Sequence, residues 1–247
     1  MKQHHFHAII AYDGTHYFGW QTTKTGPSIQ ETLSRAIQNS TQETIIPEAA
    51  SRTDRGTHAE GQSISFALQK KWDPHPLLRA INAHLPKDIR VLRMAPKTPD
   101  FHPTLHALSK EYHYRVSPQN SQTPIDRLYA WHFPYPLQLP LMEEAALFMI
   151  GTHDFSSFTT QVQKNPICTL SSIALSFPER RLQMAFKGDR FLYKMARTLA
   201  GTLLYVGCGK LPLDRIPLLL SAPDRKKGGV TAPSHGLFLH QVIYSCT

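Results

Sequence analysis

The first half of the chain alternates between strand-like and helical hydrophobic patterns in one fixed order. Residues Phe6–Tyr12 form an apolar run that ends at the turn signal Asp13-Gly14, which is typical of a buried strand. A helix is predicted after it, because Ser28-Ile29-Gln30-Glu31 is a capping box and apolar residues recur beyond it at helical spacing. Those apolar residues are Ile29, Leu33, Ala36 and Ile37.

The same alternation continues up to Met94. The predicted elements are a weak strand at Ile45-Ile46, a polar loop from Ser51 to Gly61, a half-buried strand at Ser63–Leu68, a helix that Asp73 caps and Pro86 ends, and a strand at Ile89–Met94. This order is β-α-β-β-α-β, which is the ferredoxin-like arrangement.

The second half is predicted to be a looser repeat. The expected strands are Tyr112–Val116, Ile173–Phe177, Leu182–Phe186 and Leu237–Tyr244, and the expected helices are Leu141–Met149 and about Arg190–Val206. We therefore predict an α+β protein of two ferredoxin-like halves, 1–105 and 106–247, which share one extended mixed sheet with a cleft between them. The first half would carry a loop around Asp54, and the second Tyr112 and the helix of Arg197.

The balance of charges points to an anionic partner. Lys and Arg total 27 against 18 for Asp and Glu, which gives a formal net charge of +9. Nucleic acid is the first candidate for such a partner, and scattered charge that only aids solubility is the alternative. The segment Arg225-Lys226-Lys227-Gly228-Gly229 is predicted to be a mobile basic loop, which either touches phosphates or is simply solvated.

Cysteine usage and hydropathy indicate a soluble protein of the cytoplasm. Cys168, Cys208 and Cys246 are far apart and suggest neither a disulfide framework nor a cysteine zinc site. No run approaches the roughly 20 apolar residues of a membrane helix, and the first residues lack the apolar region of a signal peptide.

The segment Arg52-Thr53-Asp54-Arg55-Gly56-Thr57-His58 places one carboxylate among two arginines and a histidine. An Asp in such a loop often serves turn chemistry or a surface ion pair. A carboxylate held by cations also stays ionised and can act as a nucleophile or a base. The residues alone leave both interpretations open.

The helix expected at about 190–206 carries Arg197 at the margin of its apolar stripe, while Lys194, Thr198 and Thr202 gather on a polar side. Arg197 can extend its charge to water along its apolar stem. Alternatively, a partly buried guanidinium needs a carboxylate partner, and Asp54 is the candidate.

Two further pairs of side chains have chemical potential. Tyr112 and Tyr114 share one face of a strand, where aromatic rings either stack on bases or belong to the core. His102 and His106 have metal-ligand spacing, but Pro103 between them argues against a regular helix and no third ligand is evident.

Taken together, these segments resemble the tRNA pseudouridine synthase A family over nearly the whole chain. The matching motifs are Tyr12-Asp13-Gly14-Thr15 with Phe18-Gly19-Trp20-Gln21, Arg52-Thr53-Asp54 with His58-Ala59, Lys110-Glu111-Tyr112, Gly151 to Phe158, Phe191 to Arg197 with Gly201-Thr202, Val206-Gly207 and Gly209-Lys210, and Ala232 to Leu237. Any one of them is a weak signal, whereas the first five in register are specific, and the segment from Ala232 to Leu237 is a further match.

The resemblance implies an isomerase that converts uridine to pseudouridine at positions 38, 39 and 40 of the tRNA anticodon stem-loop. It implies no cofactor, no metal and a homodimer. Asp54 matches the essential aspartate, Tyr112 the tyrosine that stacks on the target base, and Arg197 the arginine that pairs with the aspartate. Tyr112, Arg52 and Leu237 match positions at the substrate pocket, and Arg55, His58 and Lys110 are further predicted substrate-binding residues.

The sequence departs from the family pattern at several positions. Ser51, Arg55 and Thr57 stand where Gly, Ala and Val are usual, and Thr104 stands where Arg is usual. Arg55 adds a cation beside Asp54, and Thr104 removes one expected RNA contact. Three rival interpretations follow: an inactive RNA-binding protein of the same fold, a pseudouridine synthase with another RNA target, and, more distantly, a metal-dependent nuclease.

Overall fold

A computed structural model describes residues 3–245 of the chain, which folds as two compact units. Unit 1 comprises the described residues up to Leu108 together with those from Leu239 onward, and unit 2 is Ser109–Phe238. In this division, the residues of the last strand from Leu239 onward belong to unit 1. Among the described residues, none of the helices combines the length and the apolar character that crossing a bilayer requires.

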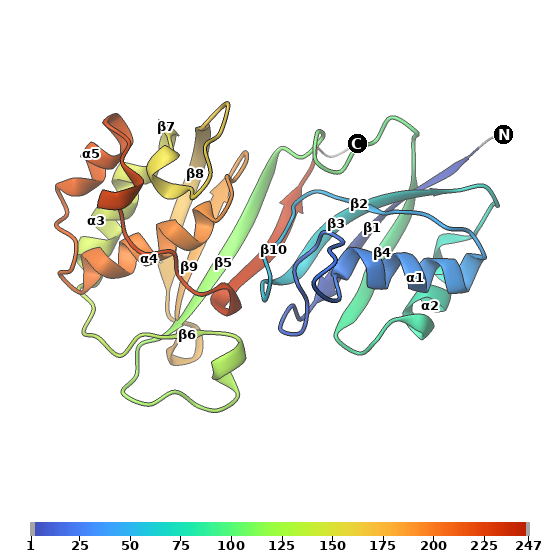
Figure 1. Cartoon of the computed structure of the whole chain (residues 1–247), viewed down its shortest axis with the longest axis horizontal. Coiled ribbons are helices and arrows are strands. Elements are labelled where there is room, and N and C mark those ends of the chain that lie inside the picture. Colours follow the sequence, from blue (N-terminus) through green and yellow to red (C-terminus); the bar gives the residue numbers. More distant parts are fainter. Residues whose placement is uncertain (1–2, 246–247) are drawn as a thin grey trace. The chain divides into compact units, whose positions relative to one another are not determined.

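Unit 1 is an antiparallel sheet with two helices against it (Figure 1). Its elements are β1 (His4–Tyr12), α1 (Ile29–Thr41), β2 (Glu48–Ala49), β3 (His58–Leu68), α2 (Pro74–His84), β4 (Ile89–Lys97) and most of β10 (Leu237–Ile243). The strand order is β4-β1-β3-β10, and β2 pairs with β3. The predicted α+β class and the β-α-β-β-α-β order are confirmed.

The helices of unit 1 form where the capping residues predict them. Ser28 Oγ accepts a hydrogen bond from the Glu31 amide at 3.2 Å, and Asp73 Oδ1 accepts one from the His75 amide at 3.3 Å. Fully buried side chains of α1 and α2 then face the sheet; they include Ile29, Leu33, Ile37, Leu77 and Ile81. Each such side chain contributes roughly 1.5–3 kcal/mol to folding, so these helices rest on packing rather than on propensity.

Two expectations for unit 1 were wrong. Ile45-Ile46 is not a strand: Ile46 is 73% exposed, and the short strand that pairs with β3 is Glu48–Ala49. The loop predicted to reach Gly61 ends earlier, because β3 begins at His58. Gly61 does not mark a turn there; a Cβ at this position would overlap the His240 carbonyl oxygen, so the glycine permits the close approach of β10.

Unit 2 is a second sheet-and-helix unit. Its elements are β5 (Ser109–Ser117), β6 (Trp131–His132), α3 (Leu139–Met149), β7 (Gly151–Asp154), β8 (Ile167–Ser176), β9 (Leu182–Gly188), α4 (Met195–Gly207) and α5 (Arg215–Ser221). The order β5-β9-β8-β7 is antiparallel throughout, and β6 adds a short parallel pairing to β5. Because β6 pairs parallel to β5 while the other three pairs are antiparallel, the sheet is mixed.

Helix α4 begins at Met195, and the expected start near Arg190 was wrong. Lys194 adopts a left-handed conformation with φ of 60°, which a right-handed helix cannot include, so residues 190–194 form an extended approach and a turn. The expected polar side of the helix is also wrong, because Thr198 and Thr202 are fully buried.

A segment from the C-terminal part of unit 2 covers that side of α4. Thr198 Oγ1 lies 3.2 Å from Thr231 Oγ1, and the Ala232 amide donates to the Arg197 carbonyl oxygen at 3.1 Å. Arg225 secures the segment through Nη1 to the Gly229 carbonyl oxygen at 2.8 Å and Nη2 to Thr231 Oγ1 at 2.9 Å. The segment predicted to be a basic loop therefore includes a short 3₁₀ turn, Arg225–Lys227, whose arginine points inward.

Candidate active site

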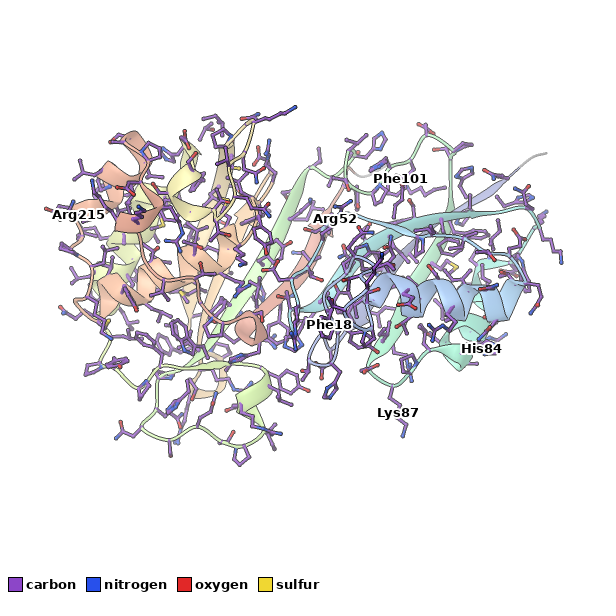
Figure 2. All side chains as sticks on the ribbon, viewed as in Figure 1. Phe18, Arg52, His84, Lys87, Phe101 and Arg215 are labelled. Atoms are coloured by element: carbon purple, nitrogen blue, oxygen red, sulfur yellow. The ribbon has the colours of Figure 1, made fainter. Side chains whose placement is uncertain are left out.

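Asp54 lies in unit 1, in the loop that joins β2 to β3 (Figure 2 labels the neighbouring Arg52 and Phe18). The loop alternates in burial: Thr53 is buried and Asp54 half-buried, whereas Arg52 and Arg55 are exposed. The chain thus holds the backbone of the loop against the unit and presents cationic side chains at its surface.

Side chains from β1 and β3 hold the first part of this loop. Gln62 Nε2 donates to the Ser51 carbonyl oxygen at 2.6 Å, and the Ser51 amide donates to Gln62 Oε1 at 3.3 Å. The Tyr12 hydroxyl lies 2.8 Å from Thr53 Oγ1 and accepts from Gln62 Nε2 at 3.4 Å. The residue before Asp54 is therefore tied to the sheet by its side chain.

Backbone hydrogen bonds hold the rest of the loop. The Trp20 amide donates to the Thr53 carbonyl oxygen at 3.0 Å, and the Gly56 amide donates to the Tyr17 carbonyl oxygen at 3.2 Å. The Thr57 amide closes a turn on the Asp54 carbonyl oxygen at 3.1 Å, with Gly56 in a left-handed conformation (φ 72°). Asp54 consequently sits on a backbone that is fixed on both sides.

His58 supports the loop from beneath. Its side chain is buried, and Nδ1 lies 3.1 Å from both the Gly14 amide nitrogen and Asp13 Oδ1. Asp13 Oδ1 in turn accepts from the Thr15 amide at 3.0 Å. The structure thus places His58, a predicted substrate-binding residue, inside the unit, where it orients the turn that follows β1.

Arg55 rests on an aromatic ring. Its guanidinium carbon lies 4.1 Å from the centroid of the Phe18 ring, which is a cation–π distance. This contact gives the exposed Arg55 side chain a defined direction beside Asp54. Arg52, Asp54 and Arg55 therefore all belong to one supported loop of unit 1, and His58 begins the strand that follows it.

Tyr112, Lys110, Arg197 and Leu237 all belong to unit 2. Tyr112 lies on β5 opposite Phe186, and Phe191 packs edge-on against its ring at 4.9 Å between centroids. Lys110 is buried on the same strand, and burial, together with the charge of Arg190, lowers its pKa.

Tyr114 belongs to the core, which is one of the two interpretations that the sequence left open for Tyr112 and Tyr114. Its ring is fully buried, and its hydroxyl donates to the Pro233 carbonyl oxygen at 2.8 Å. Burial raises the pKa of Tyr114 well above its ordinary value, so the hydroxyl keeps the proton that this bond requires.

Arg197 is half-buried on α4, and its Nε donates to the Ala232 carbonyl oxygen at 2.7 Å. Since the backbone of Ala232 also donates to the Arg197 carbonyl oxygen, the guanidinium has a fixed direction. The imidazole of His235 lies in the field of this charge: burial lowers the pKa of His235, and Arg197 adds to that shift, whereas a hydrogen bond that the imidazole donates to the Ala130 backbone raises it. Leu237 is buried at the start of β10.

His102 and His106 serve a local turn. His102 Nδ1 accepts from the Thr104 amide at 3.1 Å and the Leu105 amide at 3.2 Å, and His106 Nδ1 accepts from the His102 amide at 2.9 Å. The i, i+4 spacing thus places the His106 ring where it accepts from the backbone amide of His102. Thr104, where the family pattern has Arg, donates from Oγ1 to the Ala49 carbonyl oxygen at 2.9 Å.

Sequence reasoning missed Gln62 and the role of Tyr12. Gln62 lies within a strand that was expected to begin after it, and no local pattern distinguishes it from any polar strand residue. Tyr12 belongs to a recognised motif, Tyr12-Asp13-Gly14, but its partner Thr53 becomes visible only in the fold.

Known proteins match nearly the whole chain. A family model described as tRNA pseudouridine synthase matches residues 8–104 and 145–245. The tRNA pseudouridine synthase A 2 of Protochlamydia amoebophila (strain UWE25) is 45% identical over 242 residues, which cover 95% of this chain and 92% of that protein. The tRNA pseudouridine synthase A 1 of the same strain is 38% identical over 247 residues, covering 98% and 96%. The tRNA pseudouridine synthase A of Bacillus pumilus (strain SAFR-032) is 41% identical over 240 residues, covering 95% and 97%.

Proposed function

The chain belongs to the tRNA pseudouridine synthase family, and we propose that the uridines it isomerises are those at positions 38, 39 and 40 of the tRNA anticodon stem-loop. The enzyme is an isomerase that converts uridine in tRNA to pseudouridine. The choice of these three positions rests on the resemblance that the matching motifs carry together.

The reaction moves one glycosidic bond within a nucleotide. The bond from N1 of uracil to C1′ breaks, the base turns, a bond from C5 to C1′ forms, C5 loses its proton, and N1 takes up a proton, so the overall change is an isomerisation. The uracil must leave its stack for this, so the enzyme has to hold an extruded base. A carboxylate and an aromatic face are the two groups that such a reaction needs from a protein.

We assign the carboxylate role to Asp54. An ionised aspartate can attack C1′, add to C6, or remove a proton from C2′ to give a glycal, and all three routes use the same residue. The observation that carries this assignment is the support of its loop: Thr53 and Gly56 on either side are held by Tyr12, Trp20 and Tyr17. A fixed carboxylate suits catalysis because its position is set before substrate arrives.

Arg197 and Tyr112 complete the proposed machinery. Arg197 would keep Asp54 ionised and stabilise charge without moving, because Ala232 already fixes its guanidinium. Tyr112 would stack on the uracil and assist the removal of the C5 proton. Arg52, Arg55, Lys110 and Leu237 would contribute to substrate binding.

The proposed partner is tRNA, bound by a cytoplasmic homodimer. The net charge of +9 favours contacts with phosphates, which position an RNA without reading its sequence. Selection would then depend on the shape of the anticodon arm.

Tritium release tests the proposed function. The substrate is tRNA that carries 5-tritiated uridine in its anticodon arm, and wild type is compared with Asp54→Asn. We expect release by wild type, and a loss of turnover of at least about 10³-fold in the variant with tRNA binding retained, because the amide keeps the shape but is neither nucleophile nor base.

Residual activity of the variant within about tenfold of wild type would contradict the role of Asp54, since loss of a nucleophile costs far more. Intact binding without release by wild type would favour an inactive RNA-binding protein. Release from another RNA alone would favour a different target.

The proposed chemistry uses no metal. We expect a chelator to leave tritium release unchanged. Complete inhibition by chelator, restored by zinc, would overturn this part of the proposal.

A further inference from the structure

Gln62 is a fully buried amide in the middle of β3. It lies opposite Ile10 of β1, at the point where the register between the two strands shifts before Tyr12. A primary amide buried at such a point must have its donors and acceptors satisfied, since an unsatisfied buried polar group destabilises the fold. Its partners therefore indicate why a glutamine stands here.

Those partners belong to the loop of Asp54. The Gln62 amide both donates to the Ser51 carbonyl oxygen, at 2.6 Å, and accepts from the Ser51 amide, at 3.3 Å. It pairs with Ser51 as a neighbouring strand would. The backbone of β3 extends this pairing by one residue, because the Ala50 amide donates to the Ser63 carbonyl oxygen at 2.9 Å.

The same amide reaches the residue next to Asp54 through Tyr12. Gln62 Nε2 donates to the Tyr12 hydroxyl at 3.4 Å, and that hydroxyl lies 2.8 Å from Thr53 Oγ1. When Gln62 donates to the Tyr12 oxygen, the proton of Tyr12 is directed to Thr53. One side chain thus determines the position of the loop at Ser51 and orients the bond that holds it at Thr53.

We propose that Gln62 is a positioning residue, which sets the location of the Asp54 carboxylate through Ser51, Tyr12 and Thr53. This inference rests on the proposed catalytic role of Asp54. The requirement is for an NH2 group that donates to both the Ser51 carbonyl oxygen and the Tyr12 hydroxyl, and for an acceptor oxygen on the same side chain. Glutamate has the same shape but, when ionised, faces the Ser51 carbonyl oxygen with a second acceptor. Methionine fills the space and makes none of the hydrogen bonds of Gln62 to Ser51 and Tyr12.

The test compares Gln62→Met and Gln62→Glu with Ser63→Ala. Ser63 is the neighbouring residue on β3 and is equally buried, but its hydroxyl bonds to His7 and Tyr244 rather than to the loop. The readouts are kcat and KM for tritium release, the Kd for tRNA, and Tm. We expect both Gln62 variants to lose about 10²-fold in kcat, with the Kd for tRNA unchanged within about threefold, because a misplacement near 1 Å has this effect.

Ser63→Ala should lower Tm about as much as the Gln62 variants do. Its kcat should nevertheless stay within about threefold of wild type, because the substitution leaves the loop of Asp54 untouched. A Gln62→Met variant that loses no more kcat than Ser63→Ala would overturn the proposal. So would a loss that appears only in Tm or in the Kd for tRNA.

Tyr12→Phe tests the connection to Thr53 without altering the packing of the strand. It should lower kcat by about tenfold, and the double variant Gln62→Met, Tyr12→Phe should fall no further than Gln62→Met alone, because both act on one network. Fully multiplicative losses would show two independent effects and refute the shared path. Absence of tritium release by wild type would instead refute the proposed function, and with it the role given to Gln62.

Discussion

The backbone at Gly19 lies so close to the Thr53 carbonyl oxygen that a Cβ at this glycine would sit 2.5 Å from it. The same Cβ would lie 3.1 Å from the Asp54 carbonyl carbon and 3.2 Å from the Arg55 nitrogen. Gly19 also has a φ of 92°, which only glycine adopts readily. The turn after β1 and the loop of Asp54 are thus in direct backbone contact.

Gly19→Ala is expected to displace the loop. Gly209→Ala is the matched control, since Gly209 has a φ of 75° and no atom within 4 Å of the added Cβ. The control should lose about 1 kcal/mol of stability, the backbone cost alone. Gly19→Ala should lose at least about 2 kcal/mol more, and about 10²-fold in kcat. Urea unfolding and tritium release measure both, and equal losses in the two variants would contradict the contact.

The acid sensitivity of the protein should depend in part on His7. Burial, with the charges of Lys97 and Arg93, lowers the pKa of His7 to about 4, and its Nε2 lies 2.8 Å from Ser63 Oγ. The unfolded chain, with an ordinary value of 6.5, takes up this proton first, so stability is lost as pH falls from about 6.5 to about 4.

Between those pH values, the His7 contribution should lower the free energy of unfolding by up to about 1.4 kcal/mol for each unit by which the pH falls. His7→Gln keeps a partner for Ser63 and does not titrate, so its free energy of unfolding should fall less between pH 7 and pH 5. His16→Gln, at an exposed position, should fall as wild type does. An unchanged slope in His7→Gln would show that other groups dominate.

Arg55→Ala distinguishes two effects of the extra cation. If Arg55 contacts a phosphate, its loss should weaken tRNA binding and reduce the slope of log K against log salt by about 1, with kcat little changed. If it instead depresses the nucleophilicity of Asp54, kcat should rise at constant affinity. We expect the first result. Arg79→Ala, an exposed arginine of α2, is the control and should leave the slope unchanged.

Arg225→Ala is expected to destabilise the protein, because this arginine holds the 229–231 segment rather than an RNA. Loss of its bonds to Gly229 and Thr231 should cost about 2 kcal/mol, with tRNA affinity unchanged in the folded protein. Lys226→Ala, next to it and exposed, should change stability by less than about 0.5 kcal/mol. A loss of tRNA affinity without a loss of stability would restore the phosphate-contact interpretation of Arg225.

The sequence predicted those elements whose signals are local. Ser28 and Asp73 cap their helices with their own side chains, so α1 and α2 could be placed before any fold was known. The start of α4 could not, because Leu192 and Met195 continue the helical spacing across a turn that Lys194 makes left-handed. The polar side of α4 was misjudged because the chain that buries Thr198 arrives from Thr231.

In the candidate site, too, local signals could be recognised from the sequence, whereas contacts between distant segments could not. Asp54 was identified by a motif, and its loop was correctly placed before a strand. The groups that support it could not be inferred, since Gln62 and Tyr12 reach Ser51 and Thr53 across 11 and 41 residues of sequence. The orientation of His58, which was predicted to bind the substrate, could not be inferred either. Its motif position does not say whether the ring points toward solvent or lies under the loop.

The tethering of the loop also bears on the order in which uridines react. A carboxylate whose neighbours are bound at Ser51, Thr53 and Gly56 has little freedom to follow a moving target. We therefore expect the nucleotide, rather than the proposed carboxylate, to move, and its unstacking costs about a few kcal/mol. Among neighbouring uridines, the one that swings out of its arm most readily should be converted first, so the local stiffness of the tRNA would set the sequence of modification.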